Sequence, residues 1–469
     1  MTGALIHRPR HIRRLAVARA VATLAALAAV LATAVPASGQ AAGSWTEFQG
    51  GAERLGVAPA GTPDPALDLA WRTRAPGTDG RLSMPVVTPD IAVAVGRTVV
   101  VGLDPTDGAI QWQVPRNAGL AVPPVLAQAS EGDLVVYVEG NSAATSALVG
   151  LHLESHDRAW RFALDSQAPW SPAVVGDGVV VGTMKGTLTL VSVADGTAKW
   201  KVAAGGVITS VAASADRVFA VTEESGSGTG ALSAFDAATG RREWTRSYRL
   251  SSLISAPAVT GSTVVTAFGN GLVRAFDVAT GAERWSQPIR SRCSPRSGLA
   301  VAEGAVFVAD VQGGVYRFDA STGTRAWDYQ FEAFNRWGSP LVAGESLYLG
   351  LEDGHDGLLA ALRLSDGHLV WQRRTAGGAL GAFAPVGNLL LAPAQGVSGG
   401  ILAFTHDPDG VLNDAVSPTE LHLWMALLGY VVAFLVLGAA LLALGRFVAR
   451  SGSPTEIPPL DAAPEGGEA

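Results

Sequence analysis

The chain has 469 residues, of which 48% are hydrophobic and 16% are charged, and its formal net charge is −7. A single cysteine, Cys293, excludes an intrachain disulfide and a cysteine-rich metal cluster. The mildly acidic composition is a poor match to a phosphate backbone, so we expect no nucleic acid partner.

Residues 1–39 are predicted to be a signal peptide. Five arginines from Arg8 to Arg19 precede an uncharged, alanine-rich run from Ala20 to Val35, and small residues follow at a suitable cleavage site. An uncleaved signal anchor is the alternative, and both interpretations place the following chain outside the cytoplasm. Residues 40–65 form a lead-in segment before the first repeat.

The region 66–410 carries an internal repeat that tryptophan marks. Eight of the twelve tryptophans recur about every 43 residues. They are Trp71, Trp112, Trp160, Trp200, Trp244, Trp285, Trp327 and Trp371. Each unit contains four short apolar or alternating segments separated by glycine and asparagine turns. A period of this size with four strands is typical of a propeller blade.

The incomplete ends of the repeat predict how the ring closes. Trp71 has no turn motif before it, and the last copy, 404–410, has no tryptophan after it. The two are complementary halves of one blade, and closure removes the open sheet edge. We therefore predict an all-β fold, an eight-bladed β-propeller of four-stranded antiparallel blades in which the N-terminal strand closes the last blade.

A turn motif precedes the other seven tryptophans of the repeat and is clearest at 235–244, 276–285 and 318–327. Its glycine is suited to a positive φ, and its aspartate is suited to accepting hydrogen bonds from turn amides. The tryptophan is expected to bury its ring against the next blade and to need one acceptor for the indole N–H. We interpret these residues as structural: Asp236, Gly240, Asp277, Gly281, Asp319 and Gly323, together with the tryptophans.

The C-terminal part predicts a single membrane span. Residues 411–422 are predicted to be a juxtamembrane linker. Residues 423–445 form a run of 23 residues without a charge, which is long enough to cross a bilayer as a helix. Arg446 and Arg450 follow it, which places the propeller outside the cytoplasm and the C-terminus inside. The short acidic tail, 446–469, is expected to be disordered.

The repeat resembles the pyrroloquinoline-quinone-type (PQQ-like) β-propeller repeat, whose pattern is roughly A-x-D-x-x-T-G-x-x-x-W. The stretches AFDAATGRREW and AFDVATGAERW match it closely, and WTEFQGGAERLG at 45–56 is similar to the segment before the first blade in that family. One branch of the family contains PQQ- and Ca²⁺-dependent dehydrogenases, several with adjacent cysteines. The other is non-catalytic and includes BamB-like outer-membrane assembly propellers.

Candidate ligand-binding residues lie where the inner strands and the loops entering them would line a central funnel. They are Arg81, Trp170, Arg292, Arg296, Arg336, Trp337 and Phe383. Aromatic and arginine side chains are typical binding hot spots, so one interpretation is a recognition funnel for a peptide, a glycan or an anionic ligand. The other is that these side chains pack the top of the channel.

Other chemistry receives less support from the sequence. The acidic loops 352–356 and 407–414 lack the alternating oxygens and closing glutamate of an EF-type Ca²⁺ loop. No catalytic Ser/His/Asp or HExxH pattern appears. Cys293 lies between Arg292 and Arg296, which could lower the pKa of its thiol, although an inert buried thiol is the favoured interpretation.

These observations predict a membrane-anchored, extracytoplasmic propeller that binds a protein or cell-envelope ligand as a non-catalytic scaffold. No metal site and no resident cofactor are predicted. The alternative is a quinoprotein dehydrogenase that uses PQQ and calcium.

Overall fold

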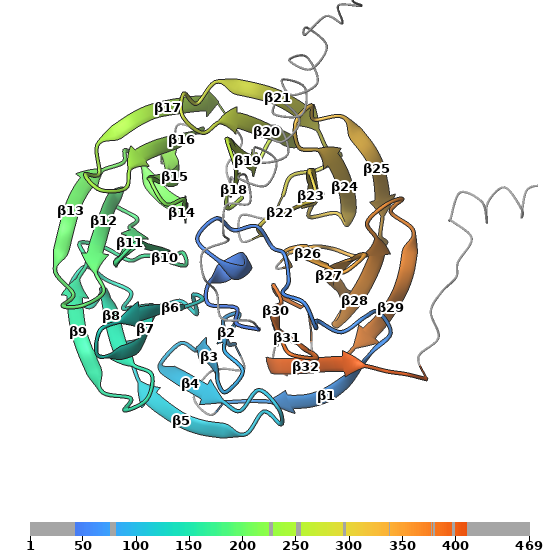
Figure 1. Ribbon diagram of the computed structural model, residues 1–469, viewed down its shortest axis with the longest axis horizontal. Coiled ribbons are helices and arrows are strands. Elements are labelled where there is room, and N and C mark those ends of the chain that lie inside the picture. The colour runs from blue at the N-terminus through green and yellow to red at the C-terminus, as the bar shows by residue number, and fades with distance from the viewer. Residues whose placement is uncertain are drawn as a thin grey trace, which may run out of the picture. The chain divides into compact units, whose positions relative to one another are not determined.

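The computed structural model describes residues 43–75, 81–224, 228–249, 255–293, 297–336, 338–376, 378, 380–395 and 399–409. They form eight four-stranded sheets arranged around a central channel, as Figure 1 shows. The predicted eight-bladed β-propeller is confirmed. Within these ranges no helix is long and apolar enough to cross a membrane. The predicted signal peptide (1–39), linker (411–422), span (423–445) and tail (446–469) lie outside the described residues.

The first four blades follow one another along the chain, each from its inner to its outer strand. The first is β2 (Val86–Val87), β3 (Ala92–Val95), β4 (Val99–Leu103) and β5 (Ile110–Pro115). The second is β6 (Val125–Ala129), β7 (Gly132–Glu139), β8 (Ala147–His152) and β9 (Arg158–Ala163). The third is β10 (Ala173–Val175), β11 (Gly178–Gly182), β12 (Thr187–Ser192) and β13 (Ala198–Ala203). The fourth is β14 (Val207–Ala213), β15 (Arg217–Glu224), β16 (Thr229–Asp236) and β17 (Arg242–Arg249).

The remaining blades continue the ring. The fifth is β18 (Ala258–Thr260), β19 (Thr263–Ala267), β20 (Leu272–Asp277) and β21 (Glu283–Pro288). The sixth is β22 (Ala300–Ala302), β23 (Ala305–Ala309), β24 (Gly314–Asp319) and β25 (Arg325–Gln330). The seventh is β26 (Leu341–Ala343), β27 (Ser346–Asp353), β28 (Asp356–Arg363) and β29 (Leu369–Thr375). The eighth has β30 (Ala384–Val386), β31 (Leu389–Ala394) and β32 (Gly400–His406).

An N-terminal strand supplies the missing outer strand of the eighth blade. β1 (Leu67–Thr73) pairs antiparallel with β32, and Trp71 lies opposite Ala403. The ring is therefore closed by hydrogen bonds between the two ends of the propeller, which leaves no open blade between them.

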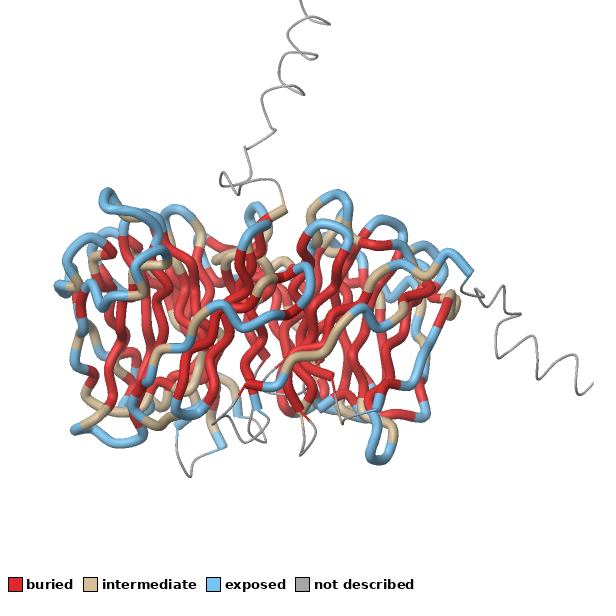
Figure 2. Tube along the Cα trace, turned by 90° about the horizontal axis from the view of Figure 1, so that it is seen from below, coloured by how far each residue is buried: buried red, intermediate tan, exposed pale blue. Residues whose placement is uncertain are grey.

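The core lies between neighbouring blades, because each sheet packs one face against the next sheet. Between the second and third blades, for example, Leu134 and Val136 share one cluster with Val179 and Val181. Figure 2 shows the buried positions running along the strands and the exposed positions concentrated in the loops at the two ends. We call the end of the channel at which the inner strands begin the funnel end. The opposite end, where each inner strand connects by a hairpin to the second strand of its blade, is called the turn end.

The tryptophans join adjacent blades in a repeated geometry. Six indole N–H groups donate to a main-chain carbonyl of the next blade at 2.8–3.0 Å. The pairs are Trp71–Pro105, Trp160–Val193, Trp200–Ala237, Trp244–Val278, Trp285–Ala320 and Trp327–Leu364. Since Trp71 belongs to β1 and Pro105 to the first blade, the same contact also crosses the closure of the ring.

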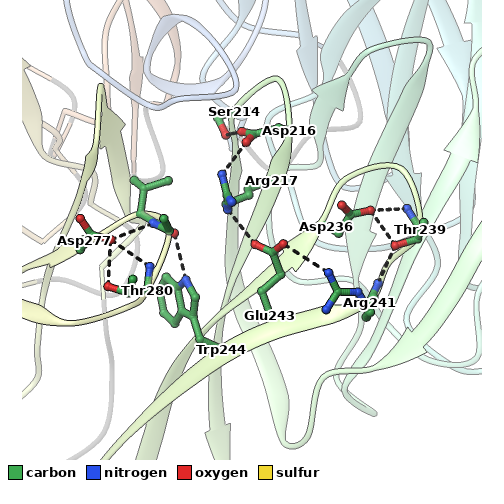
Figure 3. Close-up of polar contacts among 12 residues, drawn as sticks. Ser214, Asp216, Arg217, Asp236, Thr239, Arg241, Glu243, Trp244, Asp277 and Thr280 are labelled. Carbon is green, nitrogen blue, oxygen red and sulfur yellow. Dashed lines mark hydrogen bonds and ion pairs between the residues drawn. The ribbon is translucent and has the colours of Figure 1, made fainter.

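In the blades that keep the motif the turn is held by its aspartate, as Figure 3 shows for two of them. Asp277 Oδ1 accepts hydrogen bonds from the amide and the hydroxyl of Thr280 at 2.9 Å. Asp236 accepts the same two bonds from Thr239. At Asp319 the hydroxyl of Ser321 is the main cause that lowers the carboxyl pKa to about 2. Ionised aspartates thus fix the corner under which the tryptophan of the preceding blade lies.

The second blade departs from the motif. Its turn has His156 in place of glycine, and the residue keeps a positive φ of 61°. The imidazole ring lies against the ring of Trp112, with 4.6 Å between the centroids. A residue with a side chain is tolerated here because that side chain covers the tryptophan of the first blade.

Candidate functional site

The lead-in segment lies across the turn end of the channel. Figure 1 shows it at the centre of the ring, with its short helix η1 (Phe48–Gly50). Seven blades each donate one inner-strand N–H to it, at 2.8–3.2 Å. The donors and acceptors are Val87 to Trp45 O, Leu126 to Thr46 O, Val174 to Glu47 Oε2, Ala213 to Ala52 O, Val259 to Glu53 O, Val301 to Leu55 O and Val342 to Gly56 O. We call residues 44–58 the plug.

The strand register explains why the plug can bind the blades in sequence order. Six of the seven donors occupy the same position, one residue before the pair that closes the inner hairpin. In the second blade the hairpin is longer, and Leu126 lies three residues before its closing pair, Ala129 and Gly132. In the eighth blade that position is Pro385, which pairs with Leu390 and has no N–H to donate. Inner strands are sheet edges, so their channel-facing amides need partners. The plug supplies acceptors for these amides in the seven blades that have an N–H at this position.

A second ring of main-chain groups lies two residues before these positions in each blade, nearer the funnel end. Its members are Pro85, Pro124, Pro172, Val211, Pro257, Leu299, Pro340 and Phe383. We call it the carbonyl ring, because five of its members are prolines that present a carbonyl but no N–H.

Two plug side chains bind half of the carbonyl ring. Arg54 donates to Pro172 O at 2.6 Å and to Val211 O at 3.4 Å. Gln49 Nε2 donates to Leu299 O at 2.7 Å and to Pro340 O at 3.3 Å.

A buried ion pair lies inside the plug. Arg54 Nη1 is 3.6 Å from Glu47 Oε2, and both side chains are almost fully buried. Burial, the largest cause, raises the pKa of Glu47 to about 7, against the opposing effect of Arg54. Burial also lowers the pKa of the Arg54 guanidinium.

The funnel end opens into a cavity of about 950 Å³. Phe48 and Arg54 of the plug contribute to its lining, and Leu120 and Trp170 line it from the second and third blades. Glu352, His355 and Asp356 line it from the hairpin formed by β27 and β28. The plug thus separates this cavity from the turn end, and the cavity combines apolar walls with polar groups, as ligand sites commonly do.

Five of the seven predicted funnel residues divide into three groups. Arg81 and Trp170 line the cavity. Arg336 is exposed and forms an ion pair with Glu352, at 3.2 Å between Nε and Oε2, so it reaches a residue of the cavity wall. Arg296 and Trp337 lie outside the described residues.

The structure places the remaining two funnel candidates away from the cavity lining. Phe383 is 1% exposed and packs in the core between the seventh, eighth and first blades, because its side chain points between sheets while its carbonyl faces the channel. Arg292 is exposed but is not among the residues that line the cavity. The interpretation of Cys293 as a buried thiol agrees with its 1% exposure, and burial raises the pKa of the thiol rather than lowering it.

The cavity does not fit the calcium site of a quinoprotein dehydrogenase. Its acidic side chains are Glu352 and Asp356, and Glu352 is already held by Arg336. Ca²⁺ takes six to eight oxygen ligands. Across the part of the chain that the structure describes, no three His, Cys, Asp or Glu side chains are grouped to hold a metal ion. We therefore derive no step through PQQ or calcium.

A second cavity, of about 1110 Å³, lies at the turn end over the first four blades. Its lining includes Glu53, Asp90, Asp133 and Glu154. The sequence did not predict this cavity, because its lining residues come from unrelated turns. It did not predict the plug contacts either, because the plug is a segment that is not repeated.

Comparison with known proteins agrees with this architecture. The family described as outer membrane protein assembly factor BamB matches residues 144–296 and 228–382, which together span about half of the chain. The outer membrane protein assembly factor BamB of Burkholderia pseudomallei is 28% identical over 362 residues, covering 72% of this chain and 89% of that protein.

Solved structures share the fold at lower identity. The crystal structure of BamB from Moraxella catarrhalis has a TM-score of 0.57 and 21% identity, covering 72% of this chain and all of that one. A quinohemoprotein alcohol dehydrogenase from Pseudomonas putida has a TM-score of 0.61 and 14% identity, covering 80% and 82% of the two chains. At these identities both show the fold alone. The family match and the eight-bladed fold together establish that this chain belongs to the BamB family of PQQ-like β-propellers.

Proposed function

We propose that this chain is an extracytoplasmic scaffold that binds a polypeptide or other cell-envelope ligand in the cavity at the funnel end, without catalysing a reaction. The observation that carries the proposal is the cavity itself, which is open at the funnel end and is lined by Trp170, Leu120 and Arg81. Large apolar and arginine side chains around a concave surface are characteristic of binding hot spots.

The family relationship supports a polypeptide as the ligand. The relative from Burkholderia pseudomallei is named as an outer membrane protein assembly factor. By analogy, we propose a partner in the cell envelope. A fold alone does not establish this role, so the proposal depends on the site and needs a direct test.

The proposed location follows from the two topogenic segments of the sequence. Export by residues 1–39 and anchoring by residues 423–445 would hold the propeller at the outer surface of a membrane, with 446–469 in the cytoplasm. Deleting 423–445 is expected to move the exported propeller from the membrane fraction to the soluble fraction.

Site-specific photo-crosslinking of the full chain in cells tests the binding role. A photoreactive residue replaces Leu120, which is 38% exposed and lines the cavity, or Ile110, which is 37% exposed on the outer strand β5. We expect a discrete adduct from position 120 and none from position 110. Equal adducts at both positions, or none at position 120, would contradict a partner at the funnel.

A further inference from the structure

The cavity at the turn end is acidic. Among its described lining residues five carry a carboxyl group, and none is an arginine or a lysine. The carboxyl groups come from the plug, from the inner hairpin of the first blade and from two turns of the second blade: Glu47 and Glu53, Asp90, Asp133 and Glu154. A concave surface lined by charges of one sign concentrates ligands of the opposite charge. The lining therefore favours a cation.

Four of the five carboxylates have no partner of their own. No hydrogen bond or ion pair of these side chains is found within the described residues: Glu53, Asp90, Asp133 and Glu154. Cationic side chains at the same end, where β13 and β15 begin, are already engaged. Lys199 is paired with Asp177. Arg217 is paired with Asp216 and Glu243. The negative charge of the cavity is thus left for a group from outside.

Two buried oxygens of the plug also face this cavity without a partner. Ser44 is 5% exposed and lines the cavity, and its hydroxyl makes no hydrogen bond within the described residues. Glu47 uses Oε2 to accept the amide of Val174, whereas no hydrogen bond of its Oε1 is found in the same part of the chain. Neither oxygen is shut off from solvent, so both open toward the cavity that their residues line. Because buried polar groups normally have partners, these two indicate a ligand that donates hydrogen bonds.

The spacing of the acids decides which kind of cation fits. In the described ranges no three His, Cys, Asp or Glu side chains are grouped to hold a metal ion, so the charge is spread over the cavity. Apolar walls lie between the acids, with Ile91, Leu126 and the ring of Trp112 among them. Lysine and arginine pack their aliphatic stems on such walls while their charged ends reach outward, and an indole ring attracts a cation. A volume of about 1110 Å³ is sufficient for several residues of a chain.

We propose that the turn-end cavity binds a segment of a partner polypeptide that carries two or more lysine or arginine side chains. Its charged groups would pair with the exposed carboxylates of Asp90, Asp133 and Glu154, and one of them would donate to Ser44 Oγ. The plug lies between this cavity and the one at the funnel end. The inference is therefore a second binding surface and does not rest on the proposed function.

The test measures binding of three dye-labelled peptides to the purified full chain by fluorescence anisotropy. The peptides share the sequence Gly-Ser-X-Leu-X-Leu-X-Ser-Gly, where X is lysine, glutamine or glutamate. We expect the lysine peptide to bind at least about tenfold more tightly than the glutamine peptide, because several exposed ion pairs add together. Its affinity should fall as salt is added, and the glutamate peptide should not bind.

A pair of double variants locates the site. Asp133→Asn with Glu154→Gln removes two carboxylates of the cavity. The matched control is Glu303→Gln with Glu345→Gln, at exposed positions on the inner hairpins of the sixth and seventh blades that do not line this cavity. All four substitutions keep the shape of an exposed side chain, and thermal unfolding checks that the fold is kept. We expect the first double variant to weaken binding of the lysine peptide about three- to tenfold and the control to change it less than about twofold.

The results that overturn the inference are distinct. If the glutamine peptide binds as tightly as the lysine peptide, or if no peptide binds at millimolar concentration, the cavity does not take a cationic segment. Equal losses for the two double variants would assign the effect to overall charge. Spermidine, a free polyamine, is the last competitor: if it displaces the lysine peptide with an affinity equal to the peptide's own, the site takes a small polyamine rather than a polypeptide. Crosslinking at position 120 tests the funnel separately, whichever result is obtained.

Discussion

The indole N–H of Trp244, on the outer strand of the fourth blade, donates a hydrogen bond of 2.9 Å to the carbonyl of Val278, in a turn of the fifth blade. The bond joins two sheets that share no strand. The ring itself is 7% exposed and lies under Gly281 of the same turn. One residue thus links two neighbouring blades both by a hydrogen bond, drawn in Figure 3, and by packing of its ring.

Replacing Trp244 by Phe should separate the contribution of the hydrogen bond from that of packing. We expect a loss of about 1–3 kcal/mol in the free energy of unfolding, because the Val278 carbonyl loses its donor while most of the apolar contact remains. Truncation to Ala should cost about 3–5 kcal/mol, since it also leaves a cavity. Denaturant unfolding measures both.

Trp112→Phe is the matched control for Trp244→Phe. The Trp112 ring is less buried, and no hydrogen bond of its indole is found within the described residues. We therefore expect a smaller loss of stability. Equal losses for the two Phe variants would contradict a specific role for the bond between Trp244 and Val278.

Gly281→Ala should destabilise the propeller more than its backbone angle alone requires. Gly281 has a φ of 67°, and a Cβ there would lie 2.6 Å from ring atoms of Trp244. Gly261 has a φ of 52° with open space around the same position, so Gly261→Ala carries only the cost of the left-handed backbone, about 1–2 kcal/mol. We expect the loss of thermal stability for Gly281→Ala to exceed that for Gly261→Ala, and comparable melting temperatures would argue against the clash.

The ring architecture could be predicted from the sequence because its determinants repeat. A tryptophan, a turn aspartate and a glycine recur in register, and the missing halves at Trp71 and 404–410 predicted how the ends pair. The plug could not be predicted in the same way. Six of the seven inner-strand amides bind main-chain carbonyls of the plug, a segment that occurs once, and main-chain hydrogen bonds leave little trace in side-chain identity.

The candidate site was predicted only in part for a related reason. Arg81 and Trp170 are predicted at the cavity because they precede inner strands, and both line it. Phe383 occupies the equivalent region but points between sheets. The one available signal for the carbonyl ring was the recurring proline before the inner strands, as at Pro85, Pro172 and Pro340, and it becomes interpretable only when the strand register is known.

Hydrogen exchange should reveal the plug directly. The amides of Val259, Val301 and Val342 belong to inner edge strands, where an unpaired N–H would exchange quickly. Since each donates to a plug carbonyl at 2.8 Å, we expect slow exchange, comparable to that of amides paired inside a sheet. Mass spectrometry of short peptides after deuterium labelling measures it. Exchange as fast as that of the outer edge strand β17 would contradict a bound plug.

The buried pair of Glu47 and Arg54 predicts a dependence of stability on pH. In the native state the pKa of Glu47 is raised from its ordinary value of 4.5 to about 7, because burial disfavours the charged carboxylate. Between these pH values the native chain therefore binds more protons at this site than the unfolded chain does, and its stability falls as the pH rises. The slope from this group is at most about 1.4 kcal/mol per pH unit.

Glu47→Gln isolates this contribution, since Gln keeps the shape of the protonated acid and does not titrate. Urea unfolding at pH 5 and at pH 8 should show the variant gaining stability relative to the native chain as the pH rises. Glu53→Gln, at a partly exposed neighbour in the plug, controls for the general loss of negative charge. If Glu47→Gln instead loses stability relative to the native chain at pH 8, the attraction between the Glu47 carboxylate and Arg54 outweighs the cost of burial.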